Sequence, residues 1–381
     1  MPTNVSLLAT TEGSTEWNPF NEPLKTIEPW NFQLLAALMF VVTSLSIAEN
    51  FIVILVTVKF KQLRQPLNYI IVNLSMADFL VSIIGGTISI ATNSRGYFYL
   101  GSWACVLEGF AVTFFGIVAL WSLSVLAFER YVVICRPLGN LRLQGKHSAF
   151  AIIFVWVFSF VWTIPPTMGW SSYTTSKIGT TCEPNWYSGE MRDQTYIITF
   201  LTTCFILPLL VIFVSYGKLM RKLRKVSDTQ GRLGSTRKPE REVTRMVVIM
   251  ILAFLICWTP YAAFSILATA HPNIDLDPRL SAIPAFFAKT ASMYNPIIYV
   301  YMNKQFRRCL YQMFHLNDPD AKESNINPTS ERGVATRDNN GGEMLAIATH
   351  ITSSAVTNRE EQSSCNSFAQ IPVSENKVCP M

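Results

Sequence analysis

Charged residues are scarce in this sequence: Asp, Glu, Lys and Arg make up only 15% of its 381 residues, whereas about a quarter is usual for a soluble domain. Hydrophobic residues make up 50%, which argues against a string of soluble domains. The apolar runs are unbroken rather than alternating with polar residues, so the sequence excludes a transmembrane β-barrel. The eight cysteines and four histidines lack the spacing of metal ligands. No nucleic-acid-binding motif accompanies the net charge of +6, so we expect neither a metal nor a nucleic-acid partner.

Seven apolar runs are long enough to cross a bilayer as helices, which requires about 20 residues each. In chain order they are Phe32–Val58, Tyr69–Ala91, Cys105–Ile134, Ser148–Met168, Tyr196–Met220, Val243–Ala268 and Ser281–Met302. The sequence therefore predicts an all-α membrane protein, a seven-transmembrane helix bundle. Its predicted parts are an extracellular segment at 1–31, the bundle with one short further helix at 32–316, and a cytoplasmic tail at 317–381.

The short helix after the last span is predicted to be amphipathic. Phe306, Leu310, Met313 and Phe314 recur at helical spacing, with basic residues between them, which suits a helix lying on the inner leaflet of the membrane. Cys309 within it is a candidate for lipidation, with an unmodified buried thiol as the alternative. The remainder of the chain is polar and nearly free of aromatic residues, which is typical of a disordered tail.

The basic residues predict the orientation of the bundle. Lysines and arginines concentrate in the loops after the first, third and fifth spans and at the start of the tail. This excess marks the cytoplasmic side, so the N-terminus is predicted to lie outside and the C-terminus inside. Asn4 begins an Asn-Val-Ser glycosylation sequon on the outer side. Cys105 and Cys182 are the only two cysteines on that oxidising side, so we predict a disulfide between them.

Few ionisable residues lie within the predicted spans, where such residues by default indicate function. They are Glu49, Asp78, Glu108, Glu129, Arg130 and Lys289. Glu108 and Arg130 are separated by about 33 Å of helix, so they lie at opposite ends of the third span. Lys289 precedes Tyr299 by about 15 Å of helix, which places it near the middle of the membrane or slightly outward. Glu108 and Lys289 can therefore occupy the same layer of the bundle.

Lys289 has two interpretations. It can form a structural ion pair with Glu108 or Asp78. Alternatively, a lysine removed from water becomes a nucleophilic amine that can form a Schiff base with an aldehyde. A protonated Schiff base in an apolar environment requires a nearby anion, because an unpaired buried charge is too costly. Glu108 is the candidate for that anion.

Four other polar residues can form an internal network. Asn50, Asp78, Asn295 and Tyr299 lie in spans that can meet, and such a network can hold a sodium ion or water. Three prolines each remove a helical hydrogen bond and so predict hinges. These prolines are Pro208, Pro260 and Pro296. Trp258 stands beside the second of them, where a large ring can serve either packing or switching.

The sequence Glu129-Arg130-Tyr131 lies at the inner end of the third span. It can be a plain surface ion pair. It can equally be a latch, in which Arg130 is held by Glu129 and by Glu240 at the inner start of the sixth span.

Together these residues resemble the pattern of the rhodopsin-like G-protein-coupled receptors. The matching positions, between residue 32 and about residue 314, are Asn50, Asp78, Glu129-Arg130-Tyr131, Trp156, Cys257-Trp258-Thr259-Pro260 and Asn295-Pro296-Ile297-Ile298-Tyr299. Lys289, followed by "TASMYNPIIY", narrows the resemblance to the opsins. Glu108, three residues after Cys105, matches the counterion position of vertebrate opsins. The stretches "KIGTTCEPNWYSG" and "IPVSENKVCPM" are similar to the vertebrate ancient subfamily of opsins, which are non-visual pigments.

The resemblance implies a non-visual photoreceptor rather than an enzyme, with 11-cis-retinal as its cofactor. Lys289 would carry the retinal as a protonated Schiff base, and Glu108 would neutralise its charge. The residues at the family's pocket-lining positions are Thr113, Gly116, Tyr187, Phe205, Trp258, Tyr261 and Ala285. Light-driven isomerisation would then lead to activation of a heterotrimeric G protein, which we expect to be of the Gi/transducin class.

The resemblance also implies partners on the inner side. The residues at the family's switch and G-protein positions are Glu129, Arg130, Tyr131, Tyr216, Glu240, Asn295, Pro296 and Tyr299. The tail would meet a receptor kinase and arrestin. The expected location is the plasma membrane, with the bundle in contact with lipid.

The sequence departs from the opsin pattern in its acids. Ser176 stands where many opsins carry a second acid in the outer loop, which leaves Glu108 as the principal counterion. Glu183, directly after Cys182, is an additional acid that can come close. Glu49 beside Asn50 has no assigned role.

Three other functions fit parts of the sequence. They are a receptor for a diffusible ligand with Lys289 in a salt bridge, a retinal photoisomerase with little signalling, and a transporter with a proton relay of acids and Lys289. The lack of an inverted repeat argues against the transporter. The intact motifs around Arg130 and Asn295 favour signalling over isomerisation.

Overall fold

The computed structural model describes residues 17–135, 145–229, 238–272, 274 and 276–316, without the side chains of 223–229 and 238–241. Six helical spans in these residues are long and apolar enough to cross a membrane. They are α1 (Pro29–Lys59), Pro66–Arg95, α4 (Gly101–Cys135), Gly145–Met168, Met191–Lys222 and Glu242–Ala270. A seventh helix, α9 (Pro278–Met302), packs against α8 (Lys238–Ala270) and completes the bundle. It is less apolar because it contains Lys289 and several serine, threonine and tyrosine residues.

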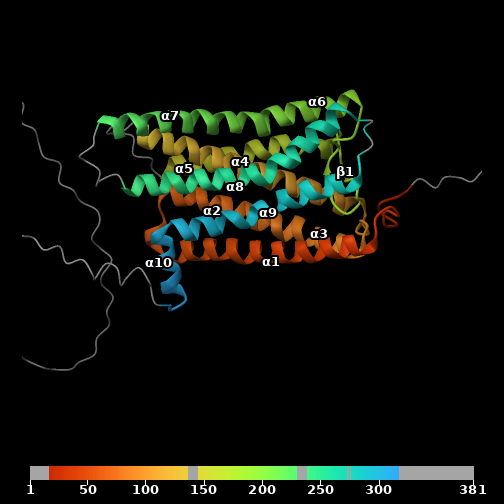
Figure 1. Ribbon diagram of the computed structural model, residues 1–381, viewed down its shortest axis with the longest axis horizontal. Coiled ribbons are helices and arrows are strands. Elements are labelled where there is room, and N and C mark those ends of the chain that lie inside the picture. The colour runs from red at the N-terminus through yellow and green to blue at the C-terminus, as the bar shows by residue number, and fades with distance from the viewer. Residues whose placement is uncertain (1–16, 136–144, 230–237, 273, 275, 317–381) are drawn as a thin grey trace, which may run out of the picture. The chain divides into compact units, whose positions relative to one another are not determined.

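The helices run side by side along the long axis of the bundle, as Figure 1 shows. The span Gly145–Met168 consists of α5 (Gly145–Thr163) and η3 (Pro165–Met168). The remaining elements cover the ends of the bundle: η1 (Lys61–Leu63), the antiparallel strands β1 (Tyr173–Thr175) and β2 (Cys182–Pro184), and α10 (Lys304–Met313). The β-hairpin lies at the end opposite α10 (Figure 1). The predicted seven-transmembrane helix bundle is therefore confirmed, with one short hairpin added in the loop after the fourth span. We call the end of the bundle with this hairpin the outer end and the end with α10 the inner end.

Two of the spans are not continuous α-helices. The second consists of α2 (Pro66–Val81), the π-helical segment η2 (Ser82–Gly86) and α3 (Thr87–Arg95). The fifth consists of α6 (Met191–Phe200), the π-helical segment η4 (Leu201–Ile206) and α7 (Leu207–Thr229). In the fifth span, Pro208 has no N–H to donate to the preceding turn, so the wider turn forms just before it.

Glycines allow three helices to approach each other at η2. A Cβ atom on Gly85 would meet the Val112 side chain of α4, and one on Gly86 would meet the Thr43 side chain of α1. The residues at these positions therefore have to be small.

Proline and capping residues set where several helices begin. Pro278 opens α9 behind the Asp277 cap, and Asn303 caps α10 by accepting a hydrogen bond from the Phe306 N–H at 3.0 Å.

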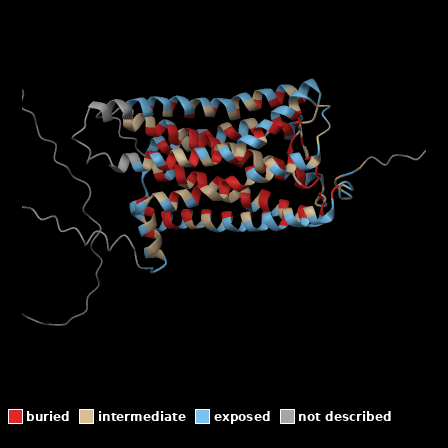
Figure 2. Ribbon diagram, viewed as in Figure 1, coloured by how far each residue is buried: buried red, intermediate tan, exposed pale blue. Residues whose placement is uncertain are grey.

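Buried residues face the interior of the bundle, and exposed ones cover its outer surface (Figure 2). Many of the exposed residues are large and apolar, among them Phe40, Phe150, Phe213 and Ile256. An apolar outer surface of this extent suits contact with lipid rather than water. The inner half of the core is continuous with α10, because Phe306 and Cys309 of that helix are both 0% exposed and pack in the same cluster as Tyr299.

The α10 helix forms where the amphipathic pattern predicts one. In Figure 1 it turns away from the long axis of the bundle. The Asn4 sequon and the tail at 317–381 lie outside the described residues, so glycosylation and the extents of the outer segment and the tail remain predictions.

Candidate functional site

Lys289 of α9 and Glu108 of α4 form an ion pair inside the bundle, with 3.1 Å between Nζ and Oε1. Glu108 is 0% exposed. The structure thus places both residues in one layer, as their spacing along the helices predicts. An ion pair withdrawn from water requires further hydrogen bonds to both partners, because desolvation is costly for each charge.

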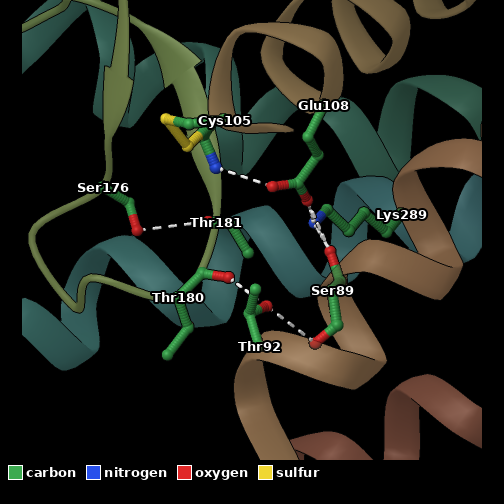
Figure 3. The surroundings of a disulfide bond; sticks show 9 residues. Ser89, Thr92, Cys105, Glu108, Ser176, Thr180, Thr181 and Lys289 are labelled. Atoms are coloured by element: carbon green, nitrogen blue, oxygen red, sulfur yellow. Dashed lines mark hydrogen bonds and ion pairs between the residues drawn. A yellow bond between two sulfur atoms is a disulfide. The ribbon is translucent and has the colours of Figure 1, made fainter. Parts of the chain in front are cut away.

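The second carboxylate oxygen of Glu108 is bound by the β-hairpin. The backbone N–H of Cys182 donates to Glu108 Oε2 at 3.0 Å. Cys182 is held there by its disulfide to Cys105, which lies about one helical turn before Glu108 on α4. The predicted disulfide is therefore confirmed, and it fixes the hairpin against the anion. Figure 3 shows this arrangement.

Ser89 of α3 joins the two charged residues (Figure 3). Its hydroxyl donates to Glu108 Oε1 at 2.6 Å and accepts a hydrogen bond from Lys289 Nζ. Ser89 is 0% exposed. Nothing in the sequence singled out Ser89 as a site residue. The one feature that marks Ser89 in the sequence is a small polar side chain in the outer third of a span. Several neighbouring residues have the same feature.

A largely apolar cavity extends from the ion pair into the bundle. Of the predicted pocket residues, those that line it are Thr113, Gly116, Phe205, Trp258, Tyr261, Ala285 and Lys289. Tyr187 is not among them and instead lies behind Glu183, to which its hydroxyl donates. The hairpin residues Thr181 to Pro184 border the outer side of the cavity.

The lining of this cavity combines one amine with aromatic side chains. The lysine amine stands among the lining residues, and aromatic side chains of α8 and η4 line it further in. Gly116 makes room for the indole of Trp258, because a Cβ atom there would lie 3.1 Å from the ring. The Trp258 N–H is buried and has no hydrogen-bond partner among the described residues.

Ser176 and Glu183, the two unusual positions of the outer loop, lie in different environments. Ser176 accepts a hydrogen bond from the Thr181 hydroxyl at 3.1 Å. Glu183 is buried beside the cavity, and its carboxyl group accepts hydrogen bonds from two tyrosines. Burial raises the pKa of the Glu183 carboxyl above its usual value. Glu183, the additional acid of the outer loop, thus borders the same cavity as Lys289.

The predicted polar network is divided into two parts. Asn295 donates to Asp78 at 3.0 Å, and Asn50 donates to the Ser292 carbonyl at 2.9 Å. Tyr299 instead donates to Asn68 on α2 at 3.0 Å. No cluster of three or more His, Cys, Asp or Glu in the described part of the chain is arranged to hold a metal ion.

The inner end of α4 carries the predicted ion pair. Arg130 is bonded through its guanidinium to both carboxylate oxygens of Glu129, and both residues are buried. The neighbouring Tyr131 ring lies 5.6 Å from Lys218 Nζ. The side chain of Glu240 lies outside the described residues, so its part in the latch remains a prediction.

Cys309 of α10, the candidate for lipidation, is fully buried, and its sulfur accepts a hydrogen bond from Gln62 at 2.8 Å. This environment favours the unmodified thiol.

Comparisons with known proteins identify the family of this chain. Residues 49–299 match the family model described as 7 transmembrane receptor (rhodopsin family). The chain is 66% identical to "Opsin-VA" of Rutilus rutilus over 367 residues, which cover 96% of each chain. It is 70% identical to "Vertebrate ancient opsin" of Salmo salar over 288 residues, which cover 76% of this chain and 88% of that one. It is 65% identical to "Pineal opsin" of Petromyzon marinus over 300 residues, which cover 79% of this chain and 68% of that one.

A solved structure of squid rhodopsin has the same arrangement of helices. Its TM-score is 0.72 at 25% sequence identity, and the match covers 80% of this chain and 93% of that chain.

Proposed function

Because this chain belongs to the rhodopsin family of seven-transmembrane receptors and is an opsin of the vertebrate ancient type, we propose that it is a non-visual photoreceptor that carries 11-cis-retinal on Lys289. The observation that carries this proposal is the Lys289 amine, which lies 3.1 Å from a fully buried Glu108 at an apolar cavity. The family resemblance found in the sequence is confirmed, and the receptor class implies signalling rather than enzymatic activity.

Lys289 provides the attachment point. Its amine would hold retinal by condensing with the aldehyde, with loss of one water molecule. A proton on the Lys289 nitrogen would then place a positive charge beside Glu108, where the lysine ammonium lies without retinal. The same carboxylate therefore stabilises the cation before and after attachment.

Glu108 holds the positive charge in place, and Ser89 and the backbone N–H of Cys182 hold Glu108. Ser89 and Cys182 each bind one oxygen of the carboxylate, at 2.6 and 3.0 Å respectively. Hydrogen bonds to an ionised carboxyl group favour its charged form. These donors therefore support the ion pair in a site from which bulk water is excluded.

Retinal supplies the absorption of visible light and a change of shape upon isomerisation. The residues that respond are those in contact with the cavity, including Trp258 on α8, two residues before Pro260. Transfer of a proton from the Lys289 nitrogen to Glu108 would remove the ion pair between α9 and α4. Loss of this pair lowers the cost of moving α8 and so shifts the population toward a state with an open inner end.

At the inner end, Arg130 and its neighbours would bind the G protein. Supporting this, the Glu129–Arg130 pair lies at the inner end of the same helix that carries Glu108. We propose a partner of the Gi/transducin class, with a receptor kinase and arrestin acting on the tail. The protein is a multi-pass membrane protein, and we place it in the plasma membrane with its N-terminus outside and its C-terminus inside.

The test is a spectrum recorded in darkness after addition of 11-cis-retinal to the expressed protein. Wild type should form a visible band and Lys289→Ala should not. Glu108→Gln should lose visible absorbance at neutral pH in favour of an ultraviolet band. Lys25→Ala, which changes an exposed lysine of the outer segment, should behave as wild type. A visible band in Lys289→Ala would refute the attachment site.

A second measurement separates signalling from isomerisation. Light-dependent nucleotide exchange on a Gi-class G protein is expected for the photoreceptor. A photoisomerase would convert retinal in light without stimulating exchange, and a receptor for a diffusible ligand would form no pigment.

A further inference from the structure

A second buried carboxyl group borders the same cavity as Lys289. Glu183 is the central residue of β2, is 6% exposed, and lines the cavity. Successive residues of a strand point to opposite faces, and the preceding residue, Cys182, is bonded to Cys105 on α4. The disulfide therefore directs the Glu183 side chain away from Cys105, and it reaches Tyr261 on α8.

Both oxygens of Glu183 accept a hydrogen bond from a phenol. The Tyr187 hydroxyl donates to Oε1 at 2.8 Å, and the Tyr261 hydroxyl donates to Oε2 at 2.6 Å. The Tyr261 oxygen also accepts from the indole N–H of Trp186 at 3.1 Å, which leaves its own proton for Glu183. A donor on each oxygen is the arrangement that stabilises an ionised carboxyl group.

The ionisation of Glu183 responds to the charge on Lys289. Burial raises the pKa of the Glu183 carboxyl, whereas the hydrogen bonds from Tyr261 and Tyr187 and the positive charge of Lys289 act to lower it. Such coupling is reciprocal. An ionised Glu183 therefore stabilises a positive charge on the Lys289 nitrogen as much as that charge stabilises Glu183.

We propose that Glu183 is a second anion for the positively charged nitrogen on Lys289, held ionised by Tyr187 and Tyr261. This inference rests on the proposed function, because it concerns the nitrogen that carries retinal. Glu108 stabilises that nitrogen by direct contact, whereas Glu183 acts on it across the cavity. Charges interact more strongly across an apolar region than across water, so direct contact is not required.

The test compares the pH at which half of the visible absorbance is lost. Glu108→Gln serves as the background, because removal of the contacting carboxylate exposes the contribution of Glu183. Adding Glu183→Gln to this variant should lower the half-loss pH by about one unit, a tenfold change in the acid dissociation constant. Halide-free buffers are needed, because a small anion could replace the charge of Glu108.

Two further variants complete the experiment. Glu190→Gln changes an exposed acid in the same outer loop and, in the same background, should leave the half-loss pH unchanged. Tyr187→Phe removes one donor and keeps Glu183, so it should shift the half-loss pH in the same direction by a smaller amount. This variant keeps the proposal testable if Glu183→Gln fails to fold.

The proposal would be overturned if neither Glu183→Gln nor Tyr187→Phe changes the half-loss pH of the Glu108→Gln variant. A lower pigment yield at an unchanged half-loss pH would also overturn it, since that result indicates a purely structural role for Glu183. Failure of the proposed function gives a different result, because wild type would then form no visible pigment at all.

Discussion

Ser89 of α3 donates a hydrogen bond to Glu108 of α4 at 2.6 Å, on the same oxygen that lies 3.1 Å from the Lys289 amine. Because the lysine also donates to Ser89, three helices meet in one small polar cluster. Glu108 is fully buried, so water cannot readily replace a hydrogen bond lost at this carboxylate. The stability of the ion pair therefore depends on a neutral side chain as well as on the two charges.

Ser89→Ala should lower the pH at which the dark pigment loses its visible band. A hydrogen bond to a charged group contributes about 1.5–3 kcal/mol, and about 1.4 kcal/mol corresponds to one pH unit. We therefore expect a fall of about one to two units, measured by alkaline titration of the absorbance. Ser94→Ala is the control, since Ser94 is an exposed residue of the same helix that bonds to its own backbone. A half-loss pH equal to that of wild type would show that Ser89 does not support the charge.

The contact of Lys289 with Glu108 was predictable because helix rise converts sequence position into depth. The part played by Ser89 was not. Thr87, Ser89 and Thr92 all lie in the outer part of the second span, and depth does not reveal which of them faces α4. Their direction depends on the π-helical segment Ser82–Gly86, which changes the register of the helix after it.

The hydrogen-bond partner of Tyr299 was also not predictable from the sequence. Its membership of one motif with Asn295 suggested one network with Asp78. Tyr299 lies one helical turn nearer the inner end than Asn295, where it meets Asn68 near the start of α2. Motif membership groups residues along one helix, whereas hydrogen bonds are decided by the depth at which two helices meet.

Gly116→Ala should destabilise the protein and reduce pigment yield. A Cβ atom at this position would lie 3.1 Å from the Trp258 ring, and overpacking a core typically costs about 1–3 kcal/mol. The measurements are the thermal midpoint and the visible absorbance per mole of protein. Gly217→Ala is the matched control in α7, where a new Cβ atom meets nothing within 4 Å. If both alanine variants behave alike, Gly116 is not needed for the approach of Trp258 to α4.

The stability of the retinal-free protein should depend on pH through Glu183. Burial raises the pKa of this carboxyl above its usual value in the folded protein, so ionising Glu183 costs part of the free energy of folding. This part is fully present below the unfolded pKa and is lost as pH rises through the folded pKa. Thermal midpoints measured over a pH series should therefore fall in wild type relative to Glu183→Gln as pH rises above 4.5. Glu190→Gln should follow wild type, and a constant gap between wild type and Glu183→Gln would contradict the expectation.

Glu129→Gln should raise nucleotide exchange in darkness. Glu129 binds the Arg130 guanidinium in a buried pair at the inner end of α4, and breaking such a pair typically costs about 3–5 kcal/mol. Only the part of this cost that differs between the resting and active states shifts their populations, so we expect a rise of several-fold rather than full activation. The measurement is exchange on a Gi-class G protein without light, with Glu190→Gln as the control on the outer side. Exchange equal to wild type would mean that the pair is equally strong in both states, and the restraint on Arg130 would then have to come from another residue, for which Glu240 is the predicted candidate.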